Sequence, residues 1–566
     1  ISPTSELLLD EAPLKLPNDL ALLPAPFFDR HDVTALRLPF VLPGMPDNAT
    51  LHSAGVVASW FGALANYRQA RFPALTDLPA NDNAVLVGVA ASLPKTVRLP
   101  PIDGPVLAIA DNPAAPGKKL LIVTGPTATD VEQAAVALAL GKSAMSGAFA
   151  HVAPVDPGPR RKPYDAPRWT PINRPVQFRE LVDNPEILQA DGSTPDAIRV
   201  NLRVPADLFS WNGAGVPLML KYRYTAPSES NNSALAIDIN DQLVKSYRLK
   251  PSGPQEAGSH QQSAILGHGA GSWQTALDIP AFRVTSANQL QVRFNLDSER
   301  NALCSGMTAN PAHAAIDPDS TIDFSGFVHY AALPNLAFFS NSGFPFTRFA
   351  DLAETALVLP DQPDAQELET YLTMLGHMGQ WTGFPALRAT VTRPAQAVAL
   401  HDKDLLVISG TPSSALPAQW RNALPLALDA PPAGSGIHRV ALGVGGAGGP
   451  LSALLAFESP VAKGRSVVVL ASTDPGHIGE LLDVLEKPDL VNAIQGDVAL
   501  VRRTHVDSRR VGAQYFIGDV PIYARIWGTA LRHPVPLALL GILAGILLAT
   551  GLFSLLQNLA ARRRGL

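Results

Sequence analysis

The sequence has little cysteine and little charge. Cys304 is the only cysteine among 566 residues, which excludes a disulfide framework within the chain and any metal site built from cysteines. We expect a buried thiol there; the alternative is a bridge to a cysteine outside this sequence. Charged residues make up 16% of the chain and the formal net charge is −5. Such a chain lacks the basic surface of nucleic-acid-binding proteins.

Sequence signals of catalysis and cofactor binding are also missing. The 13 histidines form no H-E-x-x-H pair, and no G-x-S-x-G motif occurs. The stretch 443–448 reads G-x-G-x-x-G, but a proline and an apolar run follow it, so a loop is favoured over a dinucleotide site. Gly141-Lys-Ser143 lacks the first glycine of a phosphate-binding loop, because Val136 stands in its place.

These absences favour a binding or scaffolding protein that is not an enzyme and holds no metal or cofactor. The alternative is a membrane-anchored periplasmic glycan hydrolase or esterase. That alternative stays open, since a sequence cannot show two carboxylates facing each other at the separation that glycoside hydrolysis requires.

The C-terminal segment lacks charge. No charged residue occurs in 534–561, and Leu537–Leu556 is almost wholly apolar, which matches the roughly 20 residues of a membrane span. Three arginines follow and predict a cytoplasmic tail at 562–566, with the bulk of the chain outside. The residues Ile1–Asp10 do not resemble a signal peptide, so we interpret the sequence as a mature or trimmed piece of an exported protein.

Residues 519–533 predict an amphipathic helix at the membrane interface. Its apolar and aromatic positions fall on one broad face, and they include Ile522, Tyr523, Ile526, Trp527 and Leu531. In the span, Gly541 and Gly545 form a G-x-x-x-G pattern, which permits close approach of a helix from a partner.

Two stretches, 1–154 and 344–505, have short apolar runs alternating with helical patterns. Such alternation predicts doubly wound α/β domains. The stretches also resemble each other: Phe40–Asp47 (FVLPGMPD) matches Leu357–Asp364 (LVLPDQPD), FPAL occurs at 72–75 and at 384–387, and Lys119–Thr127 has a counterpart in Arg465–Thr473. We predict two copies of one domain.

Between the copies, a linker rich in proline and arginine at 155–171 precedes a stretch with period-two alternation at 172–343. This pattern predicts an antiparallel β-sandwich or jelly roll. Aromatic faces can stack on pyranose rings, so the candidate sugar contacts are Trp211, Tyr222, Tyr224 and Trp273. Packing within the protein is the alternative for each of them.

The stretches Ser320–Asn335 (STIDFSGFVHYAALPN), Asn341–Phe346 and Asp351–Thr355 resemble the family of periplasmic B subunits of bacterial cellulose synthase. The resemblance implies two flavodoxin-like domains without flavin flanking a carbohydrate-binding jelly roll, then an amphipathic helix and one transmembrane helix. It further implies a periplasmic subunit, anchored in the inner membrane, that binds the catalytic A subunit through its tail, supports its activity and guides the β-1,4-glucan made from UDP-glucose.

Members of this family are often labelled cyclic di-GMP-binding proteins. No Arg-rich nucleotide site beside a β-barrel pattern is apparent here, so we expect cyclic di-GMP on the catalytic partner and no cofactor on this chain. Family members begin with a signal peptide and a first carbohydrate-binding domain, whereas this sequence starts almost directly at the first α/β domain.

Overall fold

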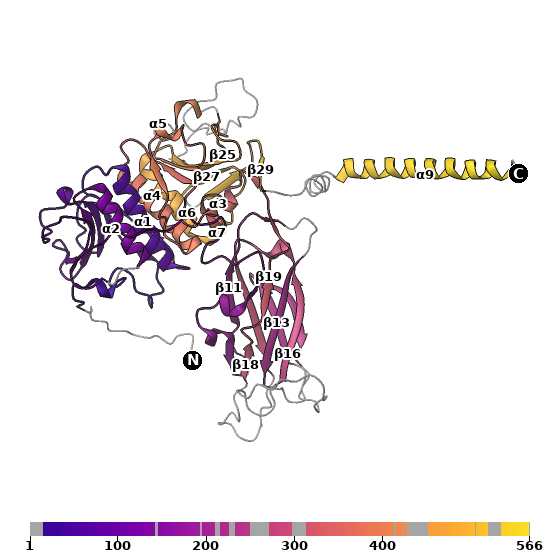
Figure 1. Ribbon diagram of the computed structural model, residues 1–566, viewed down its shortest axis with the longest axis horizontal. Coiled ribbons are helices and arrows are strands. Elements are labelled where there is room, and N and C mark those ends of the chain that lie inside the picture. The colour runs from indigo at the N-terminus through magenta and orange to yellow at the C-terminus, as the bar shows by residue number, and fades with distance from the viewer. Residues whose placement is uncertain are drawn as a thin grey trace, which may run out of the picture.

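The computed structural model describes residues 15–141, 145–192, 195–209, 215–225, 233–249, 271–296, 313–411, 415–420, 423–426, 451–503, 505–518 and 534–564. Two α/β domains lie side by side, a β-sandwich packs below them, and a long helix extends from the C-terminal side (Figure 1).

The first α/β domain has a six-stranded sheet in the order β4-β2-β5-β7-β6-β8. Its strands are β2 (Phe40–Val41), β4 (Ala74–Leu75), β5 (Ala84–Val89), β6 (Val106–Asp111), β7 (Lys119–Gly125) and β8 (Phe149–His151). Two helices, α1 (Asn48–Ala65) and α2 (Ala128–Leu140), pack on one face of this sheet, and β1 (Leu36–Arg37) pairs with β3 (Ala70–Arg71) beside it.

The second α/β domain has a seven-stranded sheet in the order β23-β22-β24-β26-β25-β27-β28. Its strands are β22 (Thr355–Val358), β23 (Thr390–Thr392), β24 (Asp404–Ser409), β25 (Ser452–Glu458), β26 (Ser466–Ser472), β27 (Val498–Arg502) and β28 (His505–Arg509). Its helices are α3 (Leu336–Ser342), α4 (Ala365–Thr382), α5 (Pro394–Ala397), α6 (Gly479–Glu486) and α7 (Pro488–Val491). The domain thus extends beyond the predicted limits 344–505 at both ends.

The predicted duplication is confirmed. Numbered within each domain, the strands of both sheets lie in the order second, first, third, fifth, fourth, sixth, and the second domain adds a seventh. The repeated stretches that begin at Lys119 and Arg465 both form the fifth strand, and α1 and α4 both have 18 residues after an aspartate N-cap. Equivalent residues of α1 and α4, and of their N-caps Asp47 and Asp364, differ in number by 317.

The prediction of doubly wound, flavodoxin-like domains needs correction. Four strands of each sheet are parallel, but β6 and β25 run antiparallel to their neighbours. The reason is the connection to the next strand. Only residues 112–118 or 459–465 link the two strands, and a parallel crossover needs about a dozen residues. The face of the first sheet away from α1 and α2 is covered by side chains from 93–102, which contain no α-helix.

The stretch 172–343 contains the predicted antiparallel sandwich. One sheet has the order β11-β17-β14-β15, with β11 (Ile198–Arg203), β14 (Ala234–Ile239), β15 (Gln242–Arg248) and β17 (Ala287–Asn295). The other sheet contains β9 (Pro175–Gln177), β10 (Gln189–Asp191), β13 (Val216–Tyr224), β16 (Gly271–Ile279), β18 (His313–Ile316) and β19 (Thr321–Asp323). Inward side chains of both sheets form one core.

Two short strand pairs lie where the sandwich meets the second α/β domain. They are β12 (Leu208–Phe209) with β20 (Val328–His329), and β21 (Ala331–Leu333) with β29 (Tyr515–Ile517). Helix α3 falls within the predicted sandwich range, but it packs in the core of the α/β domains through Leu336 and Phe339.

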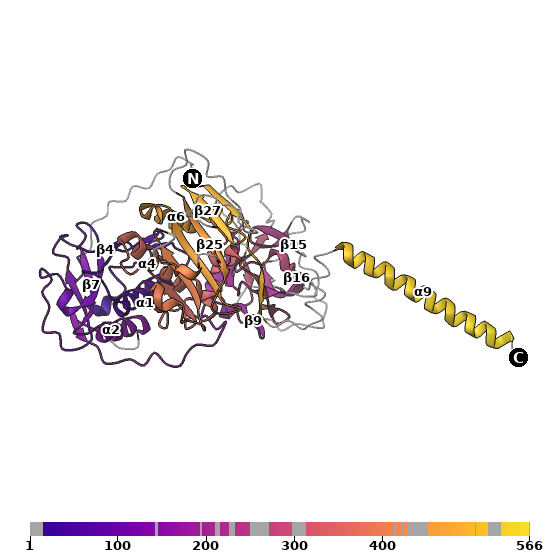
Figure 2. The same cartoon turned by 90° about the horizontal axis from the view of Figure 1, so that it is seen from above.

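The helices α1 and α4 cross between the two α/β sheets (Figure 2). A Cβ atom added at Gly62 of α1 would lie 1.9 Å from the carbonyl oxygen of Gly376, and one added at Gly379 of α4 would lie 2.0 Å from that of Ser59. The absence of side chains at these glycines lets the helices approach to backbone contact. The two domains therefore share one hydrophobic core.

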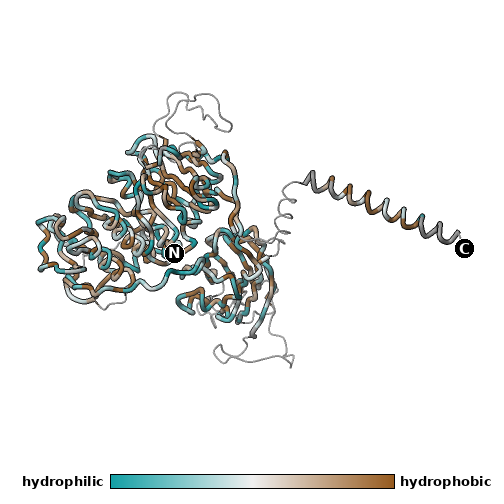
Figure 3. The backbone as a smooth tube through the Cα atoms, turned by 45° about the horizontal axis from the view of Figure 1, so that its top comes forward, coloured by the Kyte–Doolittle hydropathy of each residue, from teal (hydrophilic) through white to brown (hydrophobic). Residues whose placement is uncertain are grey.

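The C-terminal helix α9 (Pro534–Arg564) stands apart from the other domains (Figure 3). Ten of its large apolar side chains are 55% to 74% exposed, namely Leu539, Ile542, Leu543, Ile546, Leu547, Leu548, Leu552, Phe553, Leu555 and Leu556. Within the part of the chain whose side chains are described, no helix meets the combined length and hydropathy of a membrane-crossing segment.

Candidate functional site

The linker 155–171 forms hydrogen bonds with both α/β domains. The guanidinium of Arg168 donates hydrogen bonds to the carbonyl oxygens of Ala63 (2.5 Å) and Gln380 (2.9 Å). These two carbonyls are equivalent, because each belongs to the third residue from the C-terminal end of α1 or α4. A cation is stabilised at such helix ends by the partial negative charge of the last carbonyls. Arg168 thereby joins the ends of the two crossing helices.

A hydrogen bond and a ring stack join the linker to the sandwich. The carboxylate of Asp207, which is buried, accepts a hydrogen bond from the Tyr164 hydroxyl (2.6 Å) and lies 3.0 Å from the Nδ1 atom of His329. The rings of Tyr164 and His329 stack with their centroids 3.5 Å apart. Burial, followed by the nearby Asp207 carboxylate, raises the pKa of the Tyr164 hydroxyl, so the tyrosine stays protonated and donates.

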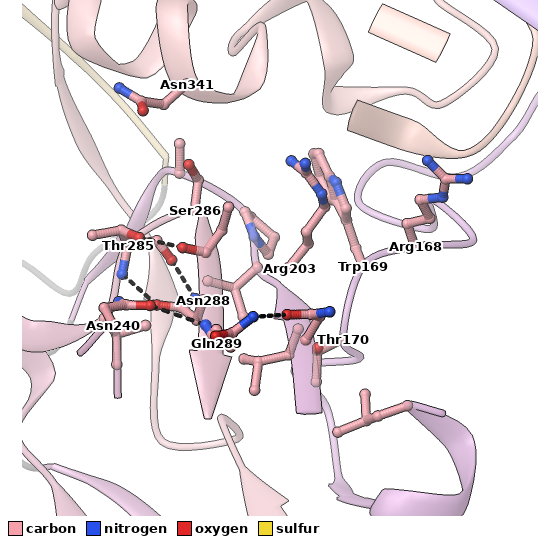
Figure 4. A pocket seen from close by; sticks show the side chains of 18 of the residues that line it. Arg168, Trp169, Thr170, Arg203, Asn240, Thr285, Ser286, Asn288, Gln289 and Asn341 are labelled. Atoms are coloured by element: carbon pink, nitrogen blue, oxygen red, sulfur yellow. Dashed lines mark hydrogen bonds between the residues drawn. The ribbon is translucent and has the colours of Figure 1, made fainter. Parts of the chain in front are cut away.

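A pocket of about 1580 Å³ lies where the linker, the sandwich and the two α/β domains meet. Figure 4 shows Asn341 of α3 on one side, Arg168 and Trp169 of the linker on another, and Asn288 and Gln289 of the sandwich opposite α3. The indole nitrogen of Trp169 donates to the carbonyl of Trp381 (3.1 Å), which places this buried ring in the wall.

The floor of the pocket comes from the outer face of β11 and β17. Period-two alternation turns Arg199, Asn201 and Arg203 away from the sandwich core, while Ile198, Val200 and Leu202 turn into it. Asn201 pairs directly with Gln289 across the strands, and the Gln289 amide donates to the Asn201 side-chain oxygen (3.0 Å). Gln289 in turn accepts from Gln291 (2.7 Å). The three amides therefore form a hydrogen-bonded row that runs along β17 and continues to β11.

Two polar groups of the pocket lack partners among the described residues. The hydroxyl of Thr170, a residue that is 3% exposed, makes no hydrogen bond there. The guanidinium of Arg203, a residue that is partly exposed, forms no ion pair or hydrogen bond with a described residue. Burial, with a smaller contribution from Arg168, lowers the pKa of Arg203 to about 10. A buried hydroxyl without a partner, such as that of Thr170, is costly, so a polar ligand that bonded to it would stabilise this arrangement.

The predicted aromatic sugar contacts are not brought together at this pocket. Tyr222 and Tyr224 share one strand face as predicted, but that face is the sandwich core, where they are 7% and 2% exposed. Trp273 is partly buried and stacks on Tyr224, with 6.0 Å between the ring centroids. This position contradicts sugar stacking by the two tyrosines, because neither has an exposed face. Trp211 lies outside the described residues.

The predicted membrane and partner residues are only partly described. Ile522, Tyr523, Ile526, Trp527 and Leu531 lie outside the described residues, as do Cys304 and the glycine-rich stretch 443–448. Gly541 and Gly545 are in α9, and an added Cβ at either would have no atom of the described chain within 4 Å. The part of the chain that is described holds no group of three His, Cys, Asp or Glu residues placed for a metal ion.

Comparison with known families agrees with this domain order. Models of cellulose synthase BcsB match three stretches: the first FD domain at 19–152, the second CBM domain at 175–321 and the second FD domain at 329–470. The chain belongs to the cellulose synthase BcsB family. The FD matches fall in the two α/β domains, the second of them ending within β26, and the CBM match falls in the sandwich. No comparison supports the hydrolase or esterase alternative.

Relatives match along the whole chain. A "Cyclic di-GMP-binding protein" of Xanthomonas axonopodis pv. citri is 38% identical over all of this chain and 75% of its own length, and one of Pseudomonas fluorescens is 37% identical over all of this chain and 78% of its own. A "Putative cellulose synthase 3" of Komagataeibacter xylinus is 32% identical over all of this chain, which covers 38% of that longer protein. Membership of the BcsB family makes the chain an accessory subunit of cellulose synthase.

Sequence reasoning missed the pocket but could have found its floor. The alternation in Ile198–Arg203 (IRVNLR) already indicates that the three polar residues share one outward face. The walls could not be found this way, because they come from three domains and a linker.

Proposed function

We propose that this chain is a non-catalytic, membrane-anchored subunit that supports the catalytic subunit of cellulose synthase and guides the emerging β-1,4-glucan on the periplasmic side of the inner membrane. The observation that carries the proposal is the match of all three folded domains to BcsB domains in the same order. The Komagataeibacter xylinus relative adds support, since its name describes a cellulose synthase and the similar region is 38% of its length.

The membrane anchor in this proposal is α9. Ten of its large apolar side chains between Leu539 and Leu556 are exposed. Transfer of a Leu or Ile side chain from water into an apolar environment is favourable by about 1.5–3 kcal/mol. The sequence Leu537–Leu556 provides the length of a span. The segment 519–533 would lie at the interface before it, and Arg562–Arg564 would face the cytoplasm.

The relatives carry the name cyclic di-GMP-binding protein, and we propose that the nucleotide acts in the complex on the catalytic partner. Equilibrium dialysis of labelled cyclic di-GMP against the purified chain and against the chain with its catalytic subunit separates the two cases. Stoichiometric binding only by the complex is expected. Stoichiometric binding by the isolated chain would place the nucleotide on this subunit.

Co-purification tests the partnership. The tagged full chain, expressed in membranes with the catalytic subunit and solubilised in mild detergent, should bring a polytopic glycosyltransferase with it. The double variant Gly541→Leu/Gly545→Leu should lose most of that partner, because two large side chains keep a facing helix away. Gly551→Leu on the same helix is the matched control and should retain it. Equal recovery with all three chains would contradict helix contact at the glycines, and no recovery with the natural chain would contradict the partnership.

A further inference from the structure

We infer that the pocket between the sandwich and the paired α/β domains binds a segment of β-glucan. The pocket takes the role that the sequence had suggested for the aromatic residues of the sandwich. This inference rests on the proposed function, in which the subunit guides that polymer. It assigns the contact to the outer face of β11 and β17, to the linker wall and to the loop that follows α1.

The size of the pocket fits a polymer segment. Pockets for small ligands measure about 300–1,000 Å³, whereas this pocket measures about 1580 Å³. It is also bounded by elements of several domains, so an extended ligand could contact the sandwich on one side and α3 on the other.

The chemistry of the floor fits a neutral polyhydroxyl ligand. Asn201 and Gln289 hold their amides on an outward sheet face, and each amide group can both donate and accept, as each sugar hydroxyl can. The pocket lining carries three cations and three carboxylates, namely Arg168, Arg199, Arg203, Glu180, Asp183 and Asp241. These mixed charges do not select an anion, and the amides contribute no charge.

The two polar groups without partners add an independent observation. The Thr170 hydroxyl is buried in the wall without a hydrogen bond from the described residues, and the Arg203 guanidinium lies in the same pocket. The backbone of these residues is joined, because the Thr170 N–H donates to the Arg203 carbonyl (2.7 Å). A sugar hydroxyl could satisfy both side chains, since it accepts from a guanidinium and pairs with a hydroxyl.

An aromatic face is available at the rim. Tyr67 lines the pocket, directly follows the C-cap of α1, and is 73% exposed. Unlike Tyr222 and Tyr224, it has a free face on which a pyranose ring could stack.

The test uses the full chain in detergent micelles with cellohexaose as the probe. Ligand-observed saturation-transfer NMR gives the dissociation constant, and a cellohexaose carrying a diazirine allows labelled peptides to be found by mass spectrometry. Crosslinks are expected on the peptides that contain Tyr67, Asn201 or Gln289. Asn201→Ala/Gln289→Ala and Tyr67→Ala should each weaken binding about tenfold.

The matched control is Gln274→Ala. Gln274 is an exposed amide on the other sheet of the sandwich, on β16, so its loss should leave the dissociation constant unchanged. Unfolding midpoints confirm that all variants fold. Crosslinks confined to other peptides, unchanged binding by the pocket variants, or no binding of cellohexaose would each overturn the inference. The proposed function is tested separately by co-purification and polymer synthesis, which do not use this probe.

Discussion

Gly62 of α1 and Gly379 of α4 are equivalent residues of the two α/β domains, and each lies against the main chain of the other helix. Gly62 faces Gly376, whose equivalent is Ser59, and Ser59 is the residue that Gly379 faces. The contact is therefore reciprocal, as at the axis of a symmetric dimer. The two copies of the domain therefore pack against each other within one chain as the two subunits of a symmetric dimer do.

The first prediction concerns this crossing. Gly62→Ala or Gly379→Ala places a methyl group about 2 Å from a backbone carbonyl, and overpacking of this kind costs about 1–3 kcal/mol. Because backbone atoms cannot move aside as a side chain can, we expect the upper part of that range in denaturant unfolding. Gly104→Ala is the control, since its added Cβ meets no atom within 4 Å. Equal unfolding midpoints for all three variants would show that the helices do not cross here.

The second prediction concerns the linker. Arg168→Ala removes two charge-assisted hydrogen bonds to the ends of α1 and α4, and we expect it to destabilise the protein by about 2–3 kcal/mol. It should also open the linker to proteolysis near residue 168. Arg174→Ala, which removes an exposed ion pair with Glu180, should leave both measurements close to those of the natural chain. A greater effect of Arg174→Ala would contradict the role of Arg168.

The third prediction concerns pH. His377 lies in α4 within the shared core, is 4% exposed, and has a buried Nδ1 atom without a partner among the described residues. Burial, with a smaller contribution from Arg71, lowers its pKa from 6.5 to about 4. Between these two values the unfolded chain binds the proton more readily than the folded chain, so stability falls as the pH falls.

The loss attributable to His377 between pH 7 and pH 5 is about 2 kcal/mol, and little further change is expected above pH 7. His377→Leu should remove this part of the pH dependence, whatever its effect on stability at pH 7. His401→Leu, which replaces an exposed histidine, should retain it. The measurement is urea unfolding at pH 5, 6 and 7; identical pH dependence in the natural chain and His377→Leu would refute the assignment.

Sequence patterns predicted the order of the domains because each pattern is local. Repeated stretches such as Phe40–Asp47 and Leu357–Asp364 indicated the duplication, and the structure gives both the same strand order. The direction of the fourth strand, β6 or β25, was missed in each copy. The seven-residue connection 112–118 contains two prolines and Gly117, which has φ of 81°, and its length alone excludes a parallel crossover.

The candidate site was harder to predict. Tyr222 and Tyr224 share one face of β13 with Val216, Leu218 and Leu220. A strand face with three apolar residues already indicates a core position. For these two residues the sequence thus already favoured packing within the protein, the alternative to sugar contact. The pocket itself could not be predicted, because Tyr67, Thr170 and Gln289 are far apart in sequence and line one pocket only when the first α/β domain, the linker and the sandwich pack together.

The most direct test of the account is cellulose synthesis in membrane vesicles that contain the catalytic subunit and one of three partners: the full chain, the tail from residue 519 to 566 exported on an unrelated leader, or residues 1–518 on an unrelated membrane anchor. The measurement is UDP-glucose-dependent polymer formation. The account predicts activity with the full chain and with the tail alone, and little with residues 1–518 on the foreign anchor. Full activity with the foreign anchor and none with the tail would contradict it.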